Sequence, residues 1–82
     1  MITGAQIRAA RALLHWSTQA TAEKVGLTRQ TLHRLELNED VPPSRTQSLL
    51  ELKRVFEEAG IEFIGAPGEG PGVRLWKKVK QS

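Results

Sequence analysis

The stretch AEKVGLTRQTLHRLE, residues 22–36, decides how this chain of 82 residues folds. Gly26 follows a short segment of helical character, and glycine at that place suits the left-handed conformation that ends a helix. Thr28 is a typical N-cap for a further helix, in which Leu32 and Leu35 recur with helical spacing. Two short helices joined by a tight turn are therefore predicted, and polar residues occupy the outer side of the second.

Two short helices joined in this way describe a helix-turn-helix, whose second helix can enter the major groove of DNA. The residue order also resembles the Cro/CI-type (XRE) repressor family, which has alanine at the position of Ala22, glycine at Gly26 and glutamate at Glu36. The resemblance covers about residues 3–60, because helices are expected before and after this stretch in the order that the family has. It implies a mainly α fold, a λ-repressor-like bundle of about four helices.

The N-terminal segment contains two helix starts. Thr3 and Gln6 have the spacing of a capping box, in which each side chain satisfies the other's backbone N–H. An apolar stripe of helical period follows, so the first helix is expected from about Gly4 to His15. Ser17 is the expected N-cap of the second helix. Trp16, directly before that cap, is expected to pack against neighbouring apolar side chains as in a hydrophobic staple.

A proline-containing loop separates the third helix from the fourth. The third helix is expected from Arg29 to about Leu37, and Asn38 is expected to end it because asparagine tolerates a positive φ. Paired prolines then break the helical hydrogen-bond pattern. A second capping box at residues 44–47 opens the fourth helix, which Gly60 ends.

After the fourth helix the sequence changes character. The segments 61–64 and 73–76 are short, β-branched and aromatic, which favours strands. The segment 65–72 between them is rich in glycine and proline and is predicted to be a loop. A C-terminal β-hairpin or pair of strands is expected, followed by a basic tail at 77–82.

The resemblance implies which residues contact DNA. Glutamine suits adenine and arginine suits guanine in bidentate contacts in the major groove. The residues expected to contact bases are Arg29, Gln30, Thr31, His33 and Arg34. The residues expected to contact the DNA backbone, at the starts of the two helices, are Ser17, Thr18, Gln19 and Thr28.

The resemblance also implies an internal salt bridge, and the chain departs from the family pattern at three positions, one of which is Asn38, where the family usually has glycine. Arg11 and Glu36 match positions that pair between the first and third helices. Many relatives have glutamine at the position of Thr18, where this chain has Gln19 one residue later. Thr21 replaces a usual apolar residue, so looser packing is expected there.

The C-terminal segment is the expected dimerising element. Residues 1–60 are expected to form the DNA-binding domain, and 61–82 to belong to that same domain. One helix-turn-helix supplies too few base contacts for tight binding, so a homodimer on a pseudo-palindromic operator is expected. Apolar strands would leave unpaired edges in a monomer. The residues expected in the dimer interface are Ile61, Phe63, Ile64, Val73, Leu75 and Trp76.

Composition excludes several other classes of function. The chain has no cysteine, so thiolate metal sites and cysteine nucleophiles are excluded, and its two histidines are too few for a metal centre. No catalytic residues, no metal and no cofactor are expected. The net charge of +3 is compatible with DNA but does not prove it. No apolar run is long enough to span a membrane and no signal peptide is recognisable, so a cytoplasmic protein without a membrane partner is expected.

Two other functions remain open from the sequence. The chain could be the antitoxin of a toxin–antitoxin pair, with DNA and a toxin as partners. It could also be an adaptor that binds another regulator without reading DNA sequence.

Overall fold

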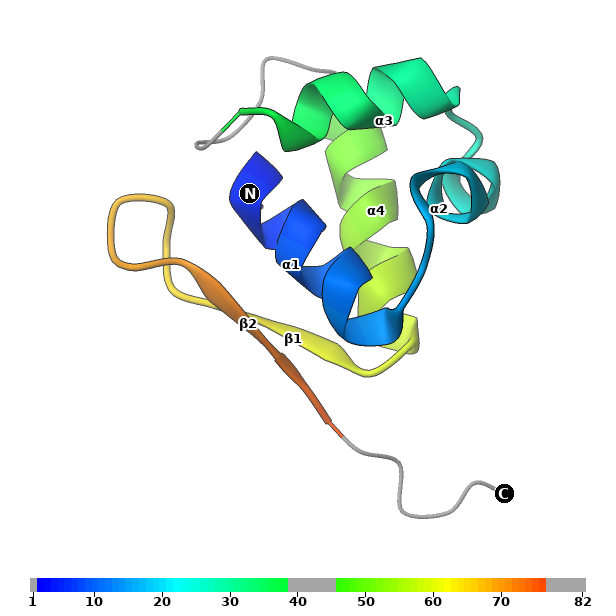
Figure 1. Cartoon of the computed structure of the whole chain (residues 1–82). Helices are drawn as coiled ribbons and strands as arrows, with labels where there is room; N and C mark the ends of the chain where they lie inside the picture. The colour runs from blue at the N-terminus through cyan, green and yellow to red at the C-terminus, as the bar shows by residue number, and fades with distance from the viewer. Residues whose placement is uncertain (1, 39–45, 77–82) are drawn as a thin grey trace.

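The computed structural model describes residues 2–38 and 46–76 and consists of four helices followed by a two-stranded antiparallel hairpin (Figure 1). This confirms the predicted mainly α bundle with a C-terminal hairpin. The expected capping box at 44–47 and the basic tail at 77–82 lie outside the described residues, wholly or in part. The elements are α1 (Gly4–Leu14), α2 (Thr18–Val25), α3 (Arg29–Glu36), α4 (Thr46–Glu58), β1 (Ile61–Ile64) and β2 (Gly72–Leu75).

The first three helices begin where the sequence predicts. Thr3 Oγ1 accepts from the Gln6 backbone N–H at 3.0 Å, and Gln6 Oε1 accepts from the Thr3 N–H at 2.9 Å, so the capping box is complete. Ser17 caps α2 and Thr28 caps α3, each through its side-chain oxygen. Local hydrogen bonding therefore fixes three helix starts without help from distant residues.

The helix ends agree less well with prediction. Gly26 ends α2 in the left-handed region, at φ 72°, as expected. The prediction for Asn38 is wrong: α3 ends at Glu36, and Leu37 continues in right-handed geometry at φ −75°. The non-glycine residue with positive φ in the described chain is His15, at φ 57°, which ends α1.

The core lies between the helices and the hairpin. Phe56 of α4 is fully buried, with the Trp16 ring stacked on it at 5.6 Å and the Phe63 ring edge-on at 6.1 Å between centroids. Trp16 thus packs against the core as predicted, and Lys24 Nζ lies 4.7 Å from its ring centroid. The buried apolar residues are Ile2, Ile7, Ala10, Ala22, Leu32, Leu35, Leu49, Leu52, Phe56 and Ile61.

Thr21 does not loosen the packing of α2. Its side chain is fully buried, and its hydroxyl donates to the Ser17 carbonyl at 2.8 Å. Because that hydroxyl is satisfied within its own helix, threonine can replace an apolar residue there without leaving an unpaired polar group. The expectation of looser packing at this position is therefore wrong.

The hairpin lies beneath α1 and α4, at the opposite end of the molecule from α3 (Figure 1). Ile61 pairs with Leu75 and Phe63 with Val73 on one side of the sheet. Ile61 lies in the core, and Phe63 and Val73 pack against it, so this side faces the helices. Gln6 joins the hairpin to α1, because its Nε2 donates to the Gly72 carbonyl at 2.8 Å and to the Ile64 carbonyl at 3.4 Å. One side chain therefore completes the capping box and anchors the hairpin.

Gly4 gives a testable consequence of close helix packing. A Cβ atom at this position would lie 2.0 Å from the Asn38 carbonyl oxygen and 2.3 Å from that of Leu35. Because both are backbone atoms at the end of α3, Gly4→Ala must displace that end, and we expect it to destabilise the fold by about 1–3 kcal/mol. Urea denaturation measures this, with Gly68→Ala as the control because no atom lies within 4 Å of a Cβ there. Equal midpoints for the two variants would contradict the close approach.

Candidate nucleic-acid interface

α3 presents a polar, basic surface on the outside of the bundle (Figure 1). Its other side holds Leu32, Leu35 and Glu36, which are buried against the core. Because the helix is anchored on that side, its outer side is held facing away from the core. The exposed residues of α3 are Arg29, Gln30, His33 and Arg34.

These four exposed side chains have no hydrogen-bond or ion-pair partner among the residues that the structure describes. No hydrogen bond or ion pair engages any of them within residues 2–38 and 46–76. Two are arginines, and this outer side of α3 carries no acidic residue. The surface can therefore donate hydrogen bonds and positive charge to an external ligand, without first breaking an internal contact.

The predicted contacts Thr28 and Thr31 are brought together at the start of α3. The Thr28 hydroxyl donates to Thr31 Oγ1 at 2.8 Å and accepts from the Thr31 backbone N–H at 3.1 Å. Both hydroxyls are thus part of the helix cap in the free protein. Thr31 is half-buried, unlike the four exposed residues of α3.

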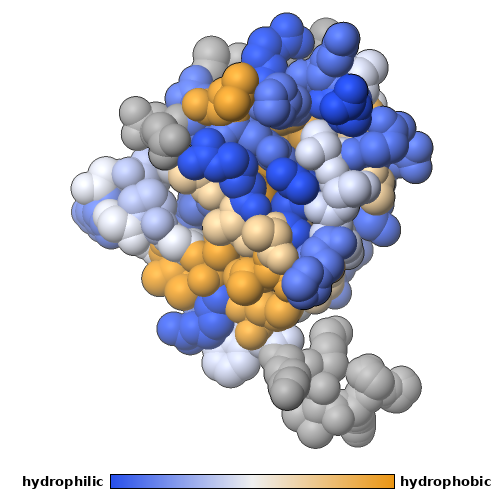
Figure 2. Space-filling model, in the orientation of Figure 1, coloured by the Kyte–Doolittle hydropathy of each residue, from blue (hydrophilic) through white to orange (hydrophobic). Residues whose placement is uncertain are grey.

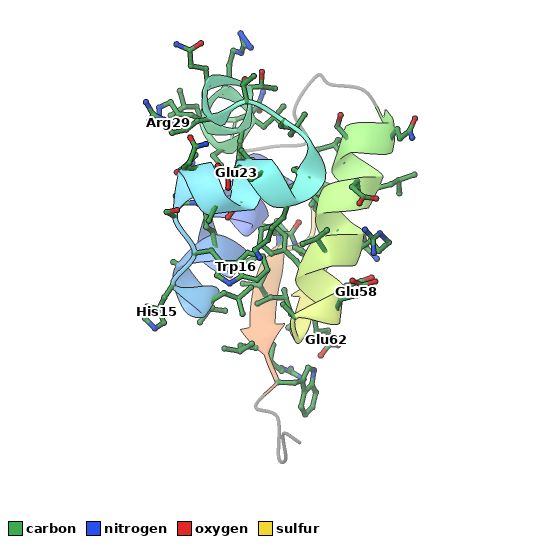
Figure 3. All side chains as sticks on the ribbon, turned by 90° about the vertical axis from the view of Figure 1, so that its right-hand side faces the viewer. His15, Trp16, Glu23, Arg29, Glu58 and Glu62 are labelled. Atoms are coloured by element: carbon green, nitrogen blue, oxygen red, sulfur yellow. The ribbon has the colours of Figure 1, made fainter. Side chains whose placement is uncertain are left out.

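α2 packs against α3, and Figure 3 shows Glu23 on α2 and Arg29 at the start of α3. Ser17 uses its hydroxyl oxygen to accept from the Ala20 N–H at 3.0 Å. Gln19 is exposed, and its Nε2 donates to Glu23 Oε2 at 2.8 Å. Of the predicted backbone contacts on α2, Gln19 therefore has its amide engaged with a carboxylate of the same helix.

Behind this surface, α1 holds the C-terminal end of α3. The Arg11 guanidinium binds the Glu36 carboxylate with two hydrogen bonds, Nε to Oε2 at 2.8 Å and Nη2 to Oε1 at 3.1 Å. Arg11 Nη1 also donates to the Trp16 carbonyl at 3.0 Å. The Glu36 side chain is only 3% exposed, so the pair lies within the helical bundle.

Sequence reasoning missed two further residues that fix α3. Arg8 Nη1 donates to the Glu36 carbonyl at 2.5 Å, at the end of the helix where backbone carbonyls lack helical partners. Gly4 allows α1 to approach that same end closely. Neither role has a local sequence signal, because both depend on how α1 crosses α3.

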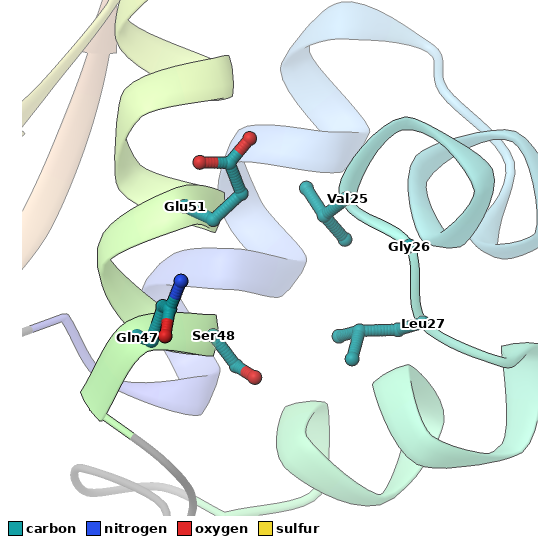
Figure 4. A pocket seen from close by; sticks show the side chains of 6 residues that line it. All are labelled: Val25, Gly26, Leu27, Gln47, Ser48 and Glu51. Atoms are coloured by element: carbon teal, nitrogen blue, oxygen red, sulfur yellow. The ribbon is translucent and has the colours of Figure 1, made fainter.

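A groove of about 430 Å³ separates the helix-turn-helix turn from α4 (Figure 4). Glu51 is its charged lining residue, and the Arg54 guanidinium that hydrogen-bonds this carboxylate lowers the pKa of Glu51 below its usual value of 4.5. Arg54 also binds Glu58, and the two carboxylates raise its own pKa further. The ionised carboxylate in its lining makes this groove unfavourable for a phosphate group. The lining residues are Val25, Gly26, Leu27, Gln47, Ser48 and Glu51.

The six residues expected in a dimer interface have different environments. Ile61 is 3% exposed within the core of its own chain, while Phe63 and Val73 pack against that core and Ile64 is half-buried. Leu75 and Trp76 are 38% and 57% exposed. Of the six, only Leu75 and Trp76 are exposed.

Trp76 does not pack on the helices. Its indole N–H donates to Glu62 Oε1 at 2.8 Å, and the Arg74 guanidinium lies 5.4 Å from its ring centroid. The three side chains form a cluster on the outer face of the hairpin, and we call it the Trp76 cluster.

The part of the chain that the structure describes holds neither a metal site nor a membrane-spanning helix. No group of three or more metal-ligating side chains occurs within 2–38 and 46–76. Among the helices described, none is long and apolar enough to cross a membrane.

Comparison with known proteins assigns the chain to a family. A family model described as a helix-turn-helix matches residues 7–51, more than half of the chain. The matched segment includes α2, α3 and most of α1. No curated protein matches the chain. The chain therefore belongs to the Cro/CI-like, XRE-type helix-turn-helix family and is a DNA-binding transcriptional regulator.

Proposed function

We propose that the protein binds a pseudo-palindromic operator as a homodimer and reads its sequence with α3 in the major groove. The observation that carries this proposal is the set of four exposed side chains on α3, two of them arginines, that have no partner within residues 2–38 and 46–76. In the helix-turn-helix arrangement the second helix enters the major groove, while the first crosses the DNA backbone.

The exposed residues of α3 have the hydrogen-bonding groups needed for base recognition. Gln30 can accept from and donate to an adenine edge, and Arg29 or Arg34 can donate twice to a guanine. His33 adds a further donor or acceptor on the same side. Thr31, whose N–H and hydroxyl belong to the helix cap, contacts a base at the edge of this set.

Phosphate contacts are proposed at the starts of α2 and α3. Backbone N–H groups at helix N-termini favour anions, and Ser17, Thr18 and Thr28 lie at these positions. Gln19 contributes an amide donor once it leaves Glu23. These contacts position the protein on the duplex, whereas the α3 side chains carry the sequence preference.

The homodimer follows from the limited reach of one α3, which has only eight residues. A two-fold dimer presents two such helices to half-sites about one helical turn apart. Selection from random duplexes tests this directly. We expect two related half-sites with centres about 10–10.5 base pairs apart, and two chains per duplex by sedimentation. A selected site without two-fold symmetry, bound by one chain, would contradict the proposal.

Single substitutions on α3 test the assignment of base contacts. Gln30→Ala and Arg29→Ala should each weaken binding to the selected duplex by about 1–3 kcal/mol and relax the preference at one position of each half-site. Fluorescence anisotropy on duplex variants measures both effects. Arg54→Ala is the matched control, because this exposed arginine binds Glu51 and Glu58 on α4. If all three variants lose affinity equally on every duplex, α3 does not read sequence.

We further propose that 61–82 and 1–60 form one domain, supported by the burial of Ile61 in the shared core. Truncation after Gly60 would then both unfold the helices and abolish dimerisation. Circular dichroism of the truncated chain tests the first effect, and a stable helical monomer would separate the two segments.

The antitoxin and adaptor alternatives make different predictions for the same experiments. An antitoxin would still select an operator but would also bind a small toxin encoded beside it. An adaptor would select no sequence at all near physiological salt.

A further inference from the structure

We propose that Glu23 limits the affinity of the protein for DNA, because its carboxylate competes with a DNA phosphate for the side-chain amide of Gln19. This inference rests on the proposed function, in which Gln19 contacts the DNA backbone. It goes further, because it gives a role to a residue outside the set of contacts and predicts that the loss of this residue strengthens binding. Gln19 and Glu23 are both exposed on α2, and Gln19 Nε2 donates to Glu23 Oε2 at 2.8 Å.

Glu23 is an exposed negative charge on the helix-turn-helix. Figure 2 shows hydrophilic residues gathered over the end of the molecule that holds α3, and hydrophobic ones nearer the hairpin. Residues 17–38 contain two carboxylates, and the other, Glu36, is buried in an ion pair. In the part of the chain that the structure describes, no basic side chain forms an ion pair with Glu23. The ammonium of Lys24, the next residue, lies over an indole ring instead. The charge of Glu23 therefore acts on any anion that approaches α2.

The amide of Gln19 cannot serve a carboxylate and a phosphate at full strength. Its Nε2 carries two N–H groups, so one can stay on Glu23 while the other donates to a phosphate. The two acceptor oxygens then lie about 5 Å apart, because each is about 2.9 Å from the nitrogen and the N–H groups diverge by about 120°. At that separation in water, two unit charges repel enough to weaken binding about fourfold. One hydrogen bond strengthens binding only about fivefold, so the repulsion offsets most of it.

The other route, in which the amide leaves Glu23 on binding, gives the same result. The hydrogen bond within α2 is then lost, which weakens binding by up to about twofold, and the carboxylate still lies within one helical turn of the phosphate. By either route the Gln19 contact adds little to affinity while Glu23 is present. Because this contact is with the DNA backbone, the effect is the same for every sequence. Glu23 therefore sets how tightly the protein binds DNA, whereas the exposed side chains of α3 set which sequence it prefers.

A double-mutant cycle, measured by fluorescence anisotropy on the selected duplex and on a scrambled one, tests this inference. Glu23→Ala should raise the affinity for both duplexes about three- to fivefold. Gln19→Ala alone should change the affinity by less than about twofold. In the Glu23→Ala background, however, Gln19→Ala should return the affinity to near the wild-type value. A gain that persists undiminished in the double variant would overturn the inference, because Glu23 would then act without Gln19.

Glu57→Ala is the matched control for charge. It also removes one exposed carboxylate, so it gives the same net charge as Glu23→Ala. Glu57, however, lies in the last turn of α4, which leads into the hairpin at the opposite end of the molecule from α3 (Figure 1). At that distance salt screens its charge, so the affinity should stay within about 1.5-fold of the wild-type value. Alanine is the strongest helix former, so Glu23→Ala should keep α2 intact, which circular dichroism checks.

The inference and the proposed function fail in different ways. If the wild type prefers the selected duplex but Glu23→Ala binds no more tightly, Glu23 does not limit affinity and the proposed function stands. If Glu57→Ala gains as much as Glu23→Ala, the gain comes from net charge alone and the inference is wrong. If the wild type has no preference for the selected duplex, α3 does not read sequence, and the cycle on scrambled DNA still decides the role of Glu23. If no duplex is bound at all, both are wrong.

Discussion

The Glu36→Ala variant should have a free energy of unfolding about 3–5 kcal/mol below that of the wild type. The substitution leaves the Arg11 guanidinium without the two carboxylate hydrogen bonds, at a position where it is 24% exposed. It also removes one of the contacts that join α1 to the end of α3. Since a small domain is stable by only about 5–15 kcal/mol, this loss is large. Urea denaturation followed by circular dichroism measures it.

Two further variants separate a buried pair from a surface pair. Glu57 binds Lys53 at 2.6 Å, but the two side chains are 45% and 40% exposed. Glu57→Ala should therefore change the free energy of unfolding by no more than about 1 kcal/mol. Glu36→Gln keeps an acceptor for Arg11 and should fall between the two alanine variants. Similar midpoints for Glu36→Ala and Glu57→Ala would show that the buried pair does not hold α3.

The Phe56→Ala variant should be destabilised by about 3–5 kcal/mol. Phe56 is fully buried and its ring touches both Trp16 and Phe63, so its removal opens a cavity between α4, the α1–α2 connection and the hairpin. Because Trp16 stacks on this ring, its fluorescence should also shift toward that of a more solvated indole. Urea denaturation and Trp16 emission, recorded with Trp76→Phe as background, measure both effects.

Leu50 provides the matched control on the same helix. It is 54% exposed, so Leu50→Ala should change the free energy of unfolding by no more than about 0.5 kcal/mol. If Phe56→Ala is no more destabilising than Leu50→Ala, the aromatic stack is not the centre of the core.

Local signals in the sequence predicted the elements of the fold well. Thr3, Ser17 and Thr28 cap their helices within one turn, and Gly26 takes the left-handed conformation, because these features depend on neighbouring residues alone. The prediction that Asn38 ends α3 is wrong, because the end of this helix does not depend on neighbouring residues alone. The tolerance of asparagine for positive φ permits a helix end but does not require one, and α3 ends instead where α1 packs against it.

Contacts between distant segments were harder to predict. The hydrogen bonds of Gln6 to the hairpin and of Arg8 to Glu36 join residues far apart in the chain. No pattern of residue spacing in the sequence predicts such bonds. The residue types of segment 61–64 predicted a strand of the hairpin, but not which of its side chains face the helices. As a result, Ile61 was expected in a dimer interface and lies in the core.

We propose that the exposed side of α3 reads DNA sequence. The most direct measurement compares wild type and an Arg29→Ala/Gln30→Ala double variant on the selected duplex and on a scrambled one, at two salt concentrations. The wild type should prefer the selected duplex by at least about 10³-fold near physiological salt, and the double variant should lose most of that preference while its weaker binding to scrambled DNA persists. Equal affinity of the wild type for both duplexes would contradict sequence reading by α3.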